Sequence, residues 1–146
     1  MSNFDYISDF KELAGLYKVA VDAELLQVSE PRQSAEMCKH VLFEICKLSA
    51  QKLNVDCSGT LSDLLDNESL VTELSNMDVL RQIRQVRRRS NAVANLGDDL
   101  NGMPYIVELL YHIVGTVLVG FGYIKSIPEY VPMSGISFDI PSEPID

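Results

Sequence analysis

Arginine is concentrated in one short stretch of an otherwise acidic chain. Five of the twelve Lys and Arg residues fall within nine positions, although the 146 residues carry a formal net charge of −9. They are Arg81, Arg84, Arg87, Arg88 and Arg89. Because the planar guanidinium group can donate paired hydrogen bonds to a phosphate, this cluster is the strongest indication of chemistry in the sequence.

A helix through this stretch would gather part of the cluster on one stripe, because each residue turns it by about 100°. The stripe contains Arg81, Arg84, Arg88, Asn91 and Asn95. It would lie roughly 120° from the apolar stripe of the same helix and so form a polar face. We therefore predict contact with RNA or DNA by Arg81, Arg84, Arg87, Arg88, Asn91 and Asn95. The alternative is that the arginines are solvated and pair with acids of neighbouring helices.

Three stretches resemble the HEPN-like helical domain that precedes the helicase motor in some type I restriction endonuclease R subunits and that also occurs as a stand-alone bacterial domain of unknown function. They are FDYISDFKELAGLYKVAVDAE (4–24), EPRQSAEMCKHVLFEICKL (30–48) and VRRRSNAVAN (86–95). The last resembles the family pattern of isoleucine, arginine, two variable residues, glycine, asparagine, two variable residues, alanine or similar, and histidine. The resemblance covers roughly residues 4–120 and implies an all-α, antiparallel HEPN-like helical bundle.

The chain departs from the family pattern at two positions. Ser90 stands where glycine is usual, and Asn95 stands where the histidine is expected. In HEPN ribonucleases an arginine, four to six residues and a histidine form the cleavage site across a dimer, and Arg88 with Asn95 keeps that spacing. An amide does not titrate near neutral pH and cannot act as a general acid or base. The resemblance thus implies a homodimer and a binding face, and it argues against ribonuclease activity.

Other catalytic or metal-binding groups are sparse. His40 and His112 each stand among apolar neighbours, which favours structural histidines that are satisfied or partly buried, and neither belongs to a metal-ligand spacing. There is no phosphate-binding glycine loop and no serine-nucleophile motif. Cys38, Cys46 and Cys57 form no CxxC pair, which favours reduced thiols in core or loop positions. We therefore predict no catalytic residue, no metal site and no cofactor.

Apolar periodicity predicts two helices in the first third of the chain. One is expected over about 9–28, and another from Pro31 to about Leu53 with Ser29 as its N-cap. Their predicted core positions are Phe10, Leu13, Tyr17 and Ala20 in the first helix, and Ala35, Cys38, Leu42, Ile45 and Ser49 in the second.

The next predicted elements lead to the arginines. Thr60 and Asp63 resemble a capping box ahead of a short helix that breaks near 66–67, after which another turn or two can form. Asn76 is predicted to cap a long helix that carries the arginine cluster and ends at Gly97. Its predicted apolar stripe contains Val79, Ile83, Val86, Ser90 and Val93.

The final predicted helix runs from Pro104 to about Tyr123 and is apolar almost all round. Glu108 and His112 would be costly in lipid, which favours a buried core helix over a membrane span. The chain length and the 47% hydrophobic content fit one domain. The N-terminal residues lack the positive charge and apolar run of an export signal, so we expect a cytoplasmic protein.

Beyond the helical bundle, expected over 1–123, we predict an extended C-terminal tail over 124–146. The tail contains Pro128, Pro132, Pro141 and Pro144, which oppose a long helix. Its apolar residues are Ile127, Val131, Ile136, Phe138 and Ile140. They are too many to leave in water, so we expect the tail to dock on the bundle, on a dimer mate or on a protein partner.

These observations favour a non-catalytic HEPN-like interaction module, dimeric, that assists a nucleic-acid-processing or anti-phage defence assembly. A second hypothesis is a metal-independent HEPN-type ribonuclease, a toxin or defence effector, that uses Arg87, Arg88, Asn91 and Asn95 without the usual histidine. A third is a structural subunit that has no contact with nucleic acid. The acidic balance of the chain confines any nucleic-acid contact to a local surface.

Overall fold

The computed structural model describes residues 2–56 and 58–132, and all regular structure in these residues is helical. The α-helices are α1 (Ala14–Leu25), α2 (Pro31–Lys52), α3 (Leu61–Leu65), α4 (Glu68–Asn76), α5 (Leu80–Asn91) and α6 (Met103–Gly120). Short 3₁₀ segments cover Asn3–Asp9, Lys11–Leu13 and Leu100–Gly102, and a π-helical turn over Ala92–Leu96 extends α5. The predicted all-α helical bundle is confirmed.

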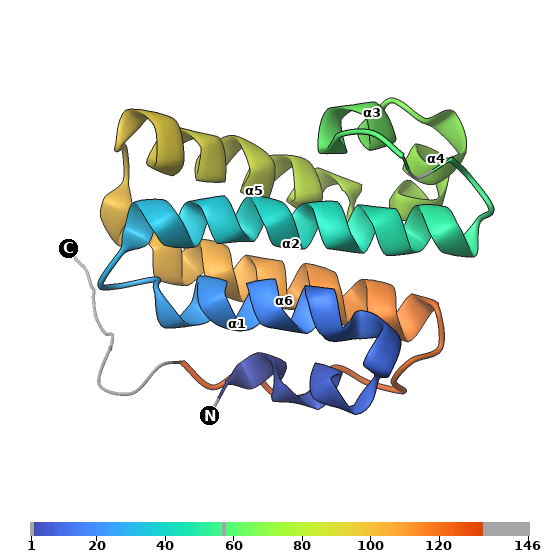
Figure 1. The fold of residues 1–146 in the computed structure, drawn as a ribbon, viewed down its shortest axis with the longest axis horizontal. Helices are drawn as coiled ribbons and strands as arrows, with labels where there is room; N and C mark the ends of the chain where they lie inside the picture. The colour runs from blue at the N-terminus through green and yellow to red at the C-terminus, as the bar shows by residue number, and fades with distance from the viewer. Residues whose placement is uncertain (1, 57, 133–146) are drawn as a thin grey trace.

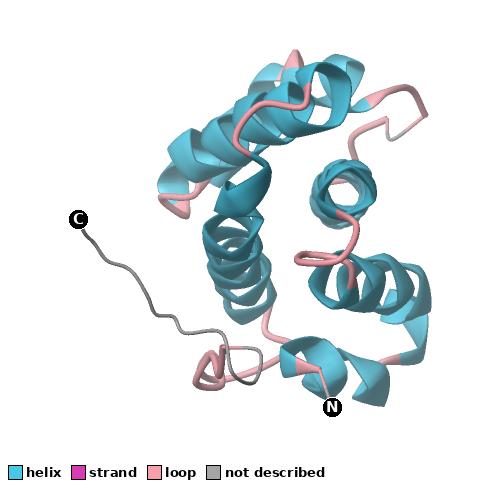
Figure 2. Cartoon of the chain, turned by 90° about the vertical axis from the view of Figure 1, so that its left-hand side faces the viewer, coloured by secondary structure: helices cyan, strands magenta, loops and turns pink. Residues whose placement is uncertain are grey.

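The long helix α2 organises the bundle, since it contacts α1, α5 and α6 (Figure 1). The short helices α3 and α4 both contact α2, α4 also contacts α5, and both lie away from α1. The N-terminal 3₁₀ segment packs against α1 on the opposite side of the molecule, as the end-on view in Figure 2 shows. Side chains of all these elements fill one continuous apolar core.

The first predicted helix begins later than expected. Residues up to 13 form two 3₁₀ segments, and Phe10 between them has an extended backbone (φ −113°, ψ 107°) that interrupts helical hydrogen bonding. Ser2 and Asp5 form a capping box that starts the first segment. The predicted single helix over 9–28 is therefore wrong in its first turn, where local capping favours a separate segment.

The second helix has the predicted extent and core. Pro31 occupies its first turn, as expected, but Ser29 is not the cap: Glu30 holds that position and its side chain makes no capping hydrogen bond. Proline at the start of the helix removes one of the N–H groups that a cap would satisfy. The predicted stripe of Ala35, Cys38, Leu42, Ile45 and Ser49 is fully buried, which confirms the periodicity.

The capping box ahead of α3 is confirmed. The Asp63 N–H donates to Thr60 Oγ1 (3.2 Å), and the Thr60 N–H donates to Asp63 Oδ2 (3.0 Å). The hydrogen bond from the Thr60 backbone holds the pKa of the Asp63 carboxyl below its ordinary value. The helix ends at Leu65 as predicted, and Asn67 caps α4 by accepting from the Leu70 N–H (3.0 Å).

Asn76 does not cap the arginine helix, contrary to the prediction. It is the last residue of α4. The chain then turns at Asp78, whose φ is 63°, and α5 begins after Val79. The predicted core stripe of Val79, Ile83, Val86, Ser90 and Val93 is nonetheless buried. Gly97 ends the element in the left-handed conformation (φ 71°), as its position predicted.

The last helix, α6, is a core element. Together with the preceding 3₁₀ segment, α6 is long and apolar enough to cross a membrane, by length and composition alone. More than half of its most apolar stretch is, however, buried inside the bundle. Tyr111 is its largest fully buried side chain and stacks edge-on against Phe4 at 5.3 Å between ring centroids. This is the packing of a core helix.

Between residues 121 and 132 the chain packs along the bundle without forming a helix, as Pro128 and Pro132 predicted. Ile127 packs against Gly115, where an added Cβ would lie 2.7 Å from Ile127 Cγ2, and Tyr111 Oη donates to the Pro128 carbonyl (2.6 Å). Asn3 exchanges two hydrogen bonds with the Val131 backbone, each 2.7 Å long. The Val131 side chain is 65% exposed, so its predicted burial is wrong. Ile136, Phe138 and Ile140 lie outside the described residues.

Candidate nucleic-acid interface

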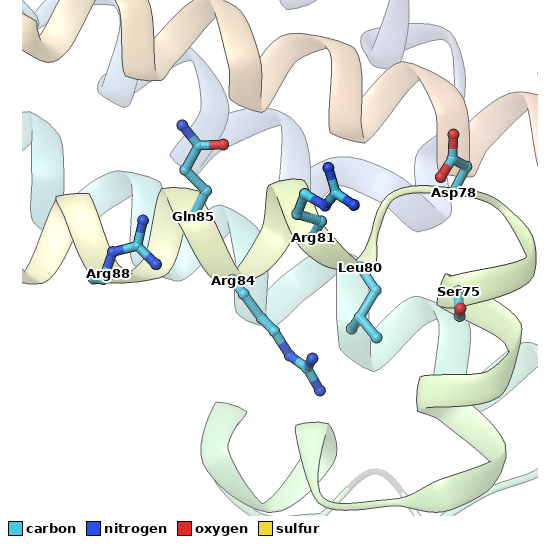
Figure 3. Close-up of a pocket in the computed structure, with 7 residues that line it drawn as sticks. All are labelled: Ser75, Asp78, Leu80, Arg81, Arg84, Gln85 and Arg88. Atoms are coloured by element: carbon cyan, nitrogen blue, oxygen red, sulfur yellow. The ribbon is translucent and has the colours of Figure 1, made fainter.

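A groove of about 530 Å³ runs along α5 beside the end of α4 (Figure 3). Its lining consists of Ser75, Asp78, Leu80, Arg81, Arg84, Gln85 and Arg88. The lining therefore comes from three arginines, one aspartate, a glutamine, a serine and a leucine. This composition suits an anionic ligand that also carries polar and apolar groups.

The buried stripe of α5 fixes the direction of these arginines. Because Val79, Ile83 and Val86 face the core, positions 81, 84 and 88 turn outward. At a rise of about 1.5 Å per residue, Arg81 and Arg88 stand roughly 10.5 Å apart along the helix axis. A strand with one phosphate per roughly 3.4 Å can thus meet more than one guanidinium at a time.

The groove arginines fan out from α5. Arg84 extends toward α3 and α4, whereas Arg81 and Gln85 point to the opposite side of the helix (Figure 3). Arg81, Arg84 and Arg88 are all exposed, and none of them forms an ion pair with any described residue. The interpretation of the arginines as partners of neighbouring acids does not hold for these three.

That interpretation does hold for Arg89. Its guanidinium donates to Asp99 Oδ2 (2.9 Å) and lies over the ring of Tyr105, 5.0 Å from the centroid. Arg89 thus ties the end of α5 to the start of α6. Arg87 is half-buried on the side of α5 that faces α2. There its positive charge opposes the rise in pKa that burial causes at the Cys46 thiol. Neither residue lines the groove.

The two predicted asparagines are not brought into the groove either. Asn91 is half-buried at the end of α5, and Asn95 is exposed in the π-helical turn that follows. Of the six predicted contact residues, the structure therefore gathers Arg81, Arg84 and Arg88 in one site and leaves Arg87, Asn91 and Asn95 outside it.

Arg32 has a role at this end of α5 that the sequence analysis did not assign. It comes from the first turn of α2 and donates to the carbonyls of Ala94 (3.3 Å) and Asn95 (3.4 Å). A cation on carbonyls at a helix C-terminus is favourable for the helix dipole. The one available signal was the position of Arg32, directly after Pro31 in the second stretch that resembles the HEPN-like family.

The histidines and cysteines supply no catalytic group to the groove. His40 and His112 are both exposed, so burial, one of the two expected alternatives, is wrong for both. His112 Nε2 lies 3.9 Å from Glu108 Oε2. Cys38 and Cys46 are buried free thiols whose pKa values burial raises to about 12. Cys57 lies outside the described residues. Within residues 2–56 and 58–132, no cluster of three His, Cys, Asp or Glu side chains could hold a metal ion.

Comparison of the chain with models of protein families, with curated proteins and with solved structures finds no match.

Proposed function

We propose that this chain is a non-catalytic, HEPN-like interaction module that binds RNA or DNA through the groove beside α5. In this proposal it acts as a homodimer in the cytoplasm and assists a nucleic-acid-processing or anti-phage defence assembly. The observation that carries the proposal is the set of three exposed arginines, Arg81, Arg84 and Arg88, which line one groove and form no ion pair with any described residue.

The charge distribution supports a local contact with the phosphate backbone. With a net charge of −9, the rest of the surface repels a polyanion, so productive encounter is restricted to the basic groove. Exposed guanidinium groups bind phosphate without first breaking an internal ion pair. Gln85 and Leu80 add an amide and an apolar contact for the sugar or base.

The non-catalytic part of the proposal follows from the missing titratable group. Neither histidine lines the groove, and Asn95 cannot exchange a proton near neutral pH. The ribonuclease hypothesis would require Arg87, Arg88, Asn91 and Asn95 to act on one phosphate. Only Arg88 of these four residues lines the groove.

Fluorescence anisotropy with labelled single-stranded RNA, single-stranded DNA and duplex DNA tests the binding proposal. We expect saturable binding by the wild-type protein. The triple variant Arg81→Gln, Arg84→Gln, Arg88→Gln should have an affinity at least about tenfold lower at low salt, the order of magnitude that phosphate contacts contribute. A matched control removes one exposed positive charge from another element, Lys11→Gln. Equal affinity of the triple variant and the wild type would reject the groove as the binding site.

A nuclease assay on the same RNA tests the second half of the proposal. The wild-type protein should leave the RNA intact. Cleavage that Arg88→Ala abolishes would mean that the chain is a ribonuclease.

A further inference from the structure

The exposed large apolar side chains of the described residues are not scattered over the surface. They are Leu25, Val28, Leu96, Leu100, Tyr105 and Val131. The first two belong to the end of α1 and its connection to α2, and the next three to the connection between α5 and α6 and the first turn of α6. Both connections lie at the same end of the bundle (Figure 1).

Contacts in the structure join these segments into one end surface. Arg32 at the start of α2 donates to the carbonyls of Ala94 and Asn95, which brings the two connections together. Asn3 donates to Glu24 at the end of α1 (2.6 Å) and binds the Val131 backbone. We name Leu25, Val28, Leu96, Leu100 and Tyr105 the apolar end; several neighbouring exposed apolar side chains of this kind mark an interaction site.

We propose that the apolar end is the docking site of the chain's own C-terminal residues 133–146. The described residues end at 132. The residue before, Val131, is hydrogen-bonded through its backbone to the Asn3 side chain at this end of the bundle. The segment that follows contains Ile136, Phe138 and Ile140 between Pro132 and Pro141. Apolar residues at alternate positions share one side of an extended chain, which gives the segment an apolar edge to lay on the surface.

The C-terminal segment is long enough to extend well away from Val131. An extended chain spans about 3.3–3.6 Å per residue, so the six residues 133–138, which follow Pro132, reach roughly 20 Å. The docking would continue an intramolecular interface that already exists, in which Ile127 packs against Gly115 and Tyr130 lies 5.1 Å from Tyr111 between ring centroids. Tethering to the bundle gives the segment an effective concentration in the millimolar range, so a weak apolar contact is sufficient.

Cysteine trapping in the full-length chain tests the proposal. The substitutions Leu100→Cys and Phe138→Cys place one thiol on the apolar end and one on the segment, with Cys57→Ser to remove a background thiol. Cys38 and Cys46 stay in place, because their burial keeps them unreactive. A control pair, Gln85→Cys with Phe138→Cys, tests whether the segment lies in the arginine groove instead. Leu100 is 38% exposed, so its substitution should leave the fold intact.

We expect mild oxidation to form an intramolecular disulfide in the Leu100 pair at least about tenfold faster than in the Gln85 pair, because docking raises the local thiol concentration. Adding Leu96→Asp should reduce this rate toward that of the control, with an unchanged circular dichroism spectrum. Disulfide-linked dimers as the main product would mean that a second copy covers the apolar end. Equal rates in both pairs, or faster trapping at Gln85, would also overturn the proposal. None of these outcomes depends on nucleic-acid binding.

Discussion

Removing a single guanidinium from the groove should lower the salt dependence of RNA binding by a predictable amount. For single strands, the logarithm of the binding constant falls with the logarithm of salt concentration with a slope of about −0.7 per phosphate neutralised. If Arg81, Arg84 and Arg88 each neutralise one phosphate, the slope is about −2.1. Affinity should then fall about 18-fold between 50 and 200 mM salt.

The Arg84→Gln variant tests this value with one exposed side chain. Glutamine keeps much of the length and the hydrogen-bonding capacity but loses the charge, so the expected slope is about −1.4 and the expected loss of affinity over the same range is about sevenfold. Anisotropy titrations of one labelled RNA at several salt concentrations give both slopes. Lys11→Gln removes the same charge from another exposed position and should leave the slope at its wild-type value, since distant charges are largely screened.

Two results would refute this reasoning. A slope near zero in the wild-type protein would mean that binding does not release phosphate counterions. Equal reductions in slope from Arg84→Gln and Lys11→Gln would mean that the protein responds to total charge and not to the groove.

Three further predictions concern packing and assembly. Ser90→Ala should stabilise the domain by about 1 kcal/mol in urea unfolding, because the buried Ser90 hydroxyl has no hydrogen-bond partner within residues 2–56 and 58–132. Ser34→Ala should instead cost about 1 kcal/mol, because the Ser34 hydroxyl donates to the Ala23 carbonyl at 2.6 Å. A stabilised Ser34→Ala variant and a destabilised Ser90→Ala variant would contradict this assignment. Gly115→Ala should cost about 1–3 kcal/mol through the clash with Ile127, more than the gain of about 1 kcal/mol in helix propensity, and should speed tryptic cleavage after Lys125; unchanged cleavage would mean that the segment does not depend on this contact. Light scattering at micromolar concentration should give a dimer, and a mass of 16.3 kDa would count against it.

The core of the bundle was predictable because helical periodicity is a local signal. Every position of the stripes assigned to α2 and α5 is buried, including polar Ser49 and Ser90. The capping box of Thr60 and Asp63 was also readable, since both partners lie within four residues of each other. Such features depend on side chains that are close in sequence.

The groove was only partly predictable, because one wall comes from another element. The helical stripe identified Arg81, Arg84 and Arg88, but Ser75 belongs to α4 and Asp78 to a turn with positive φ. Asn76 resembled a cap in sequence, and only the tertiary structure shows that it ends α4. The same holds for Asn95, which shares the stripe of an ideal helix but falls in the π-helical turn beyond the groove.

The position of Asn95 connects the question of catalysis to the oligomeric state. Arg88 and Asn95 stand seven residues apart, or roughly 10 Å along the axis, and helical side chains lean in the same direction, so within one chain the two groups do not converge. A general base must come within about 3 Å of the proton that it removes, which leaves a second chain as the source of a convergent pair. We therefore expect Asn95→His to gain RNA cleavage only at concentrations where the protein is dimeric, and Arg88→Ala to abolish that gain. Gel assays across a dilution series measure both effects. Cleavage by Asn95→His that is independent of protein concentration would show that one chain suffices.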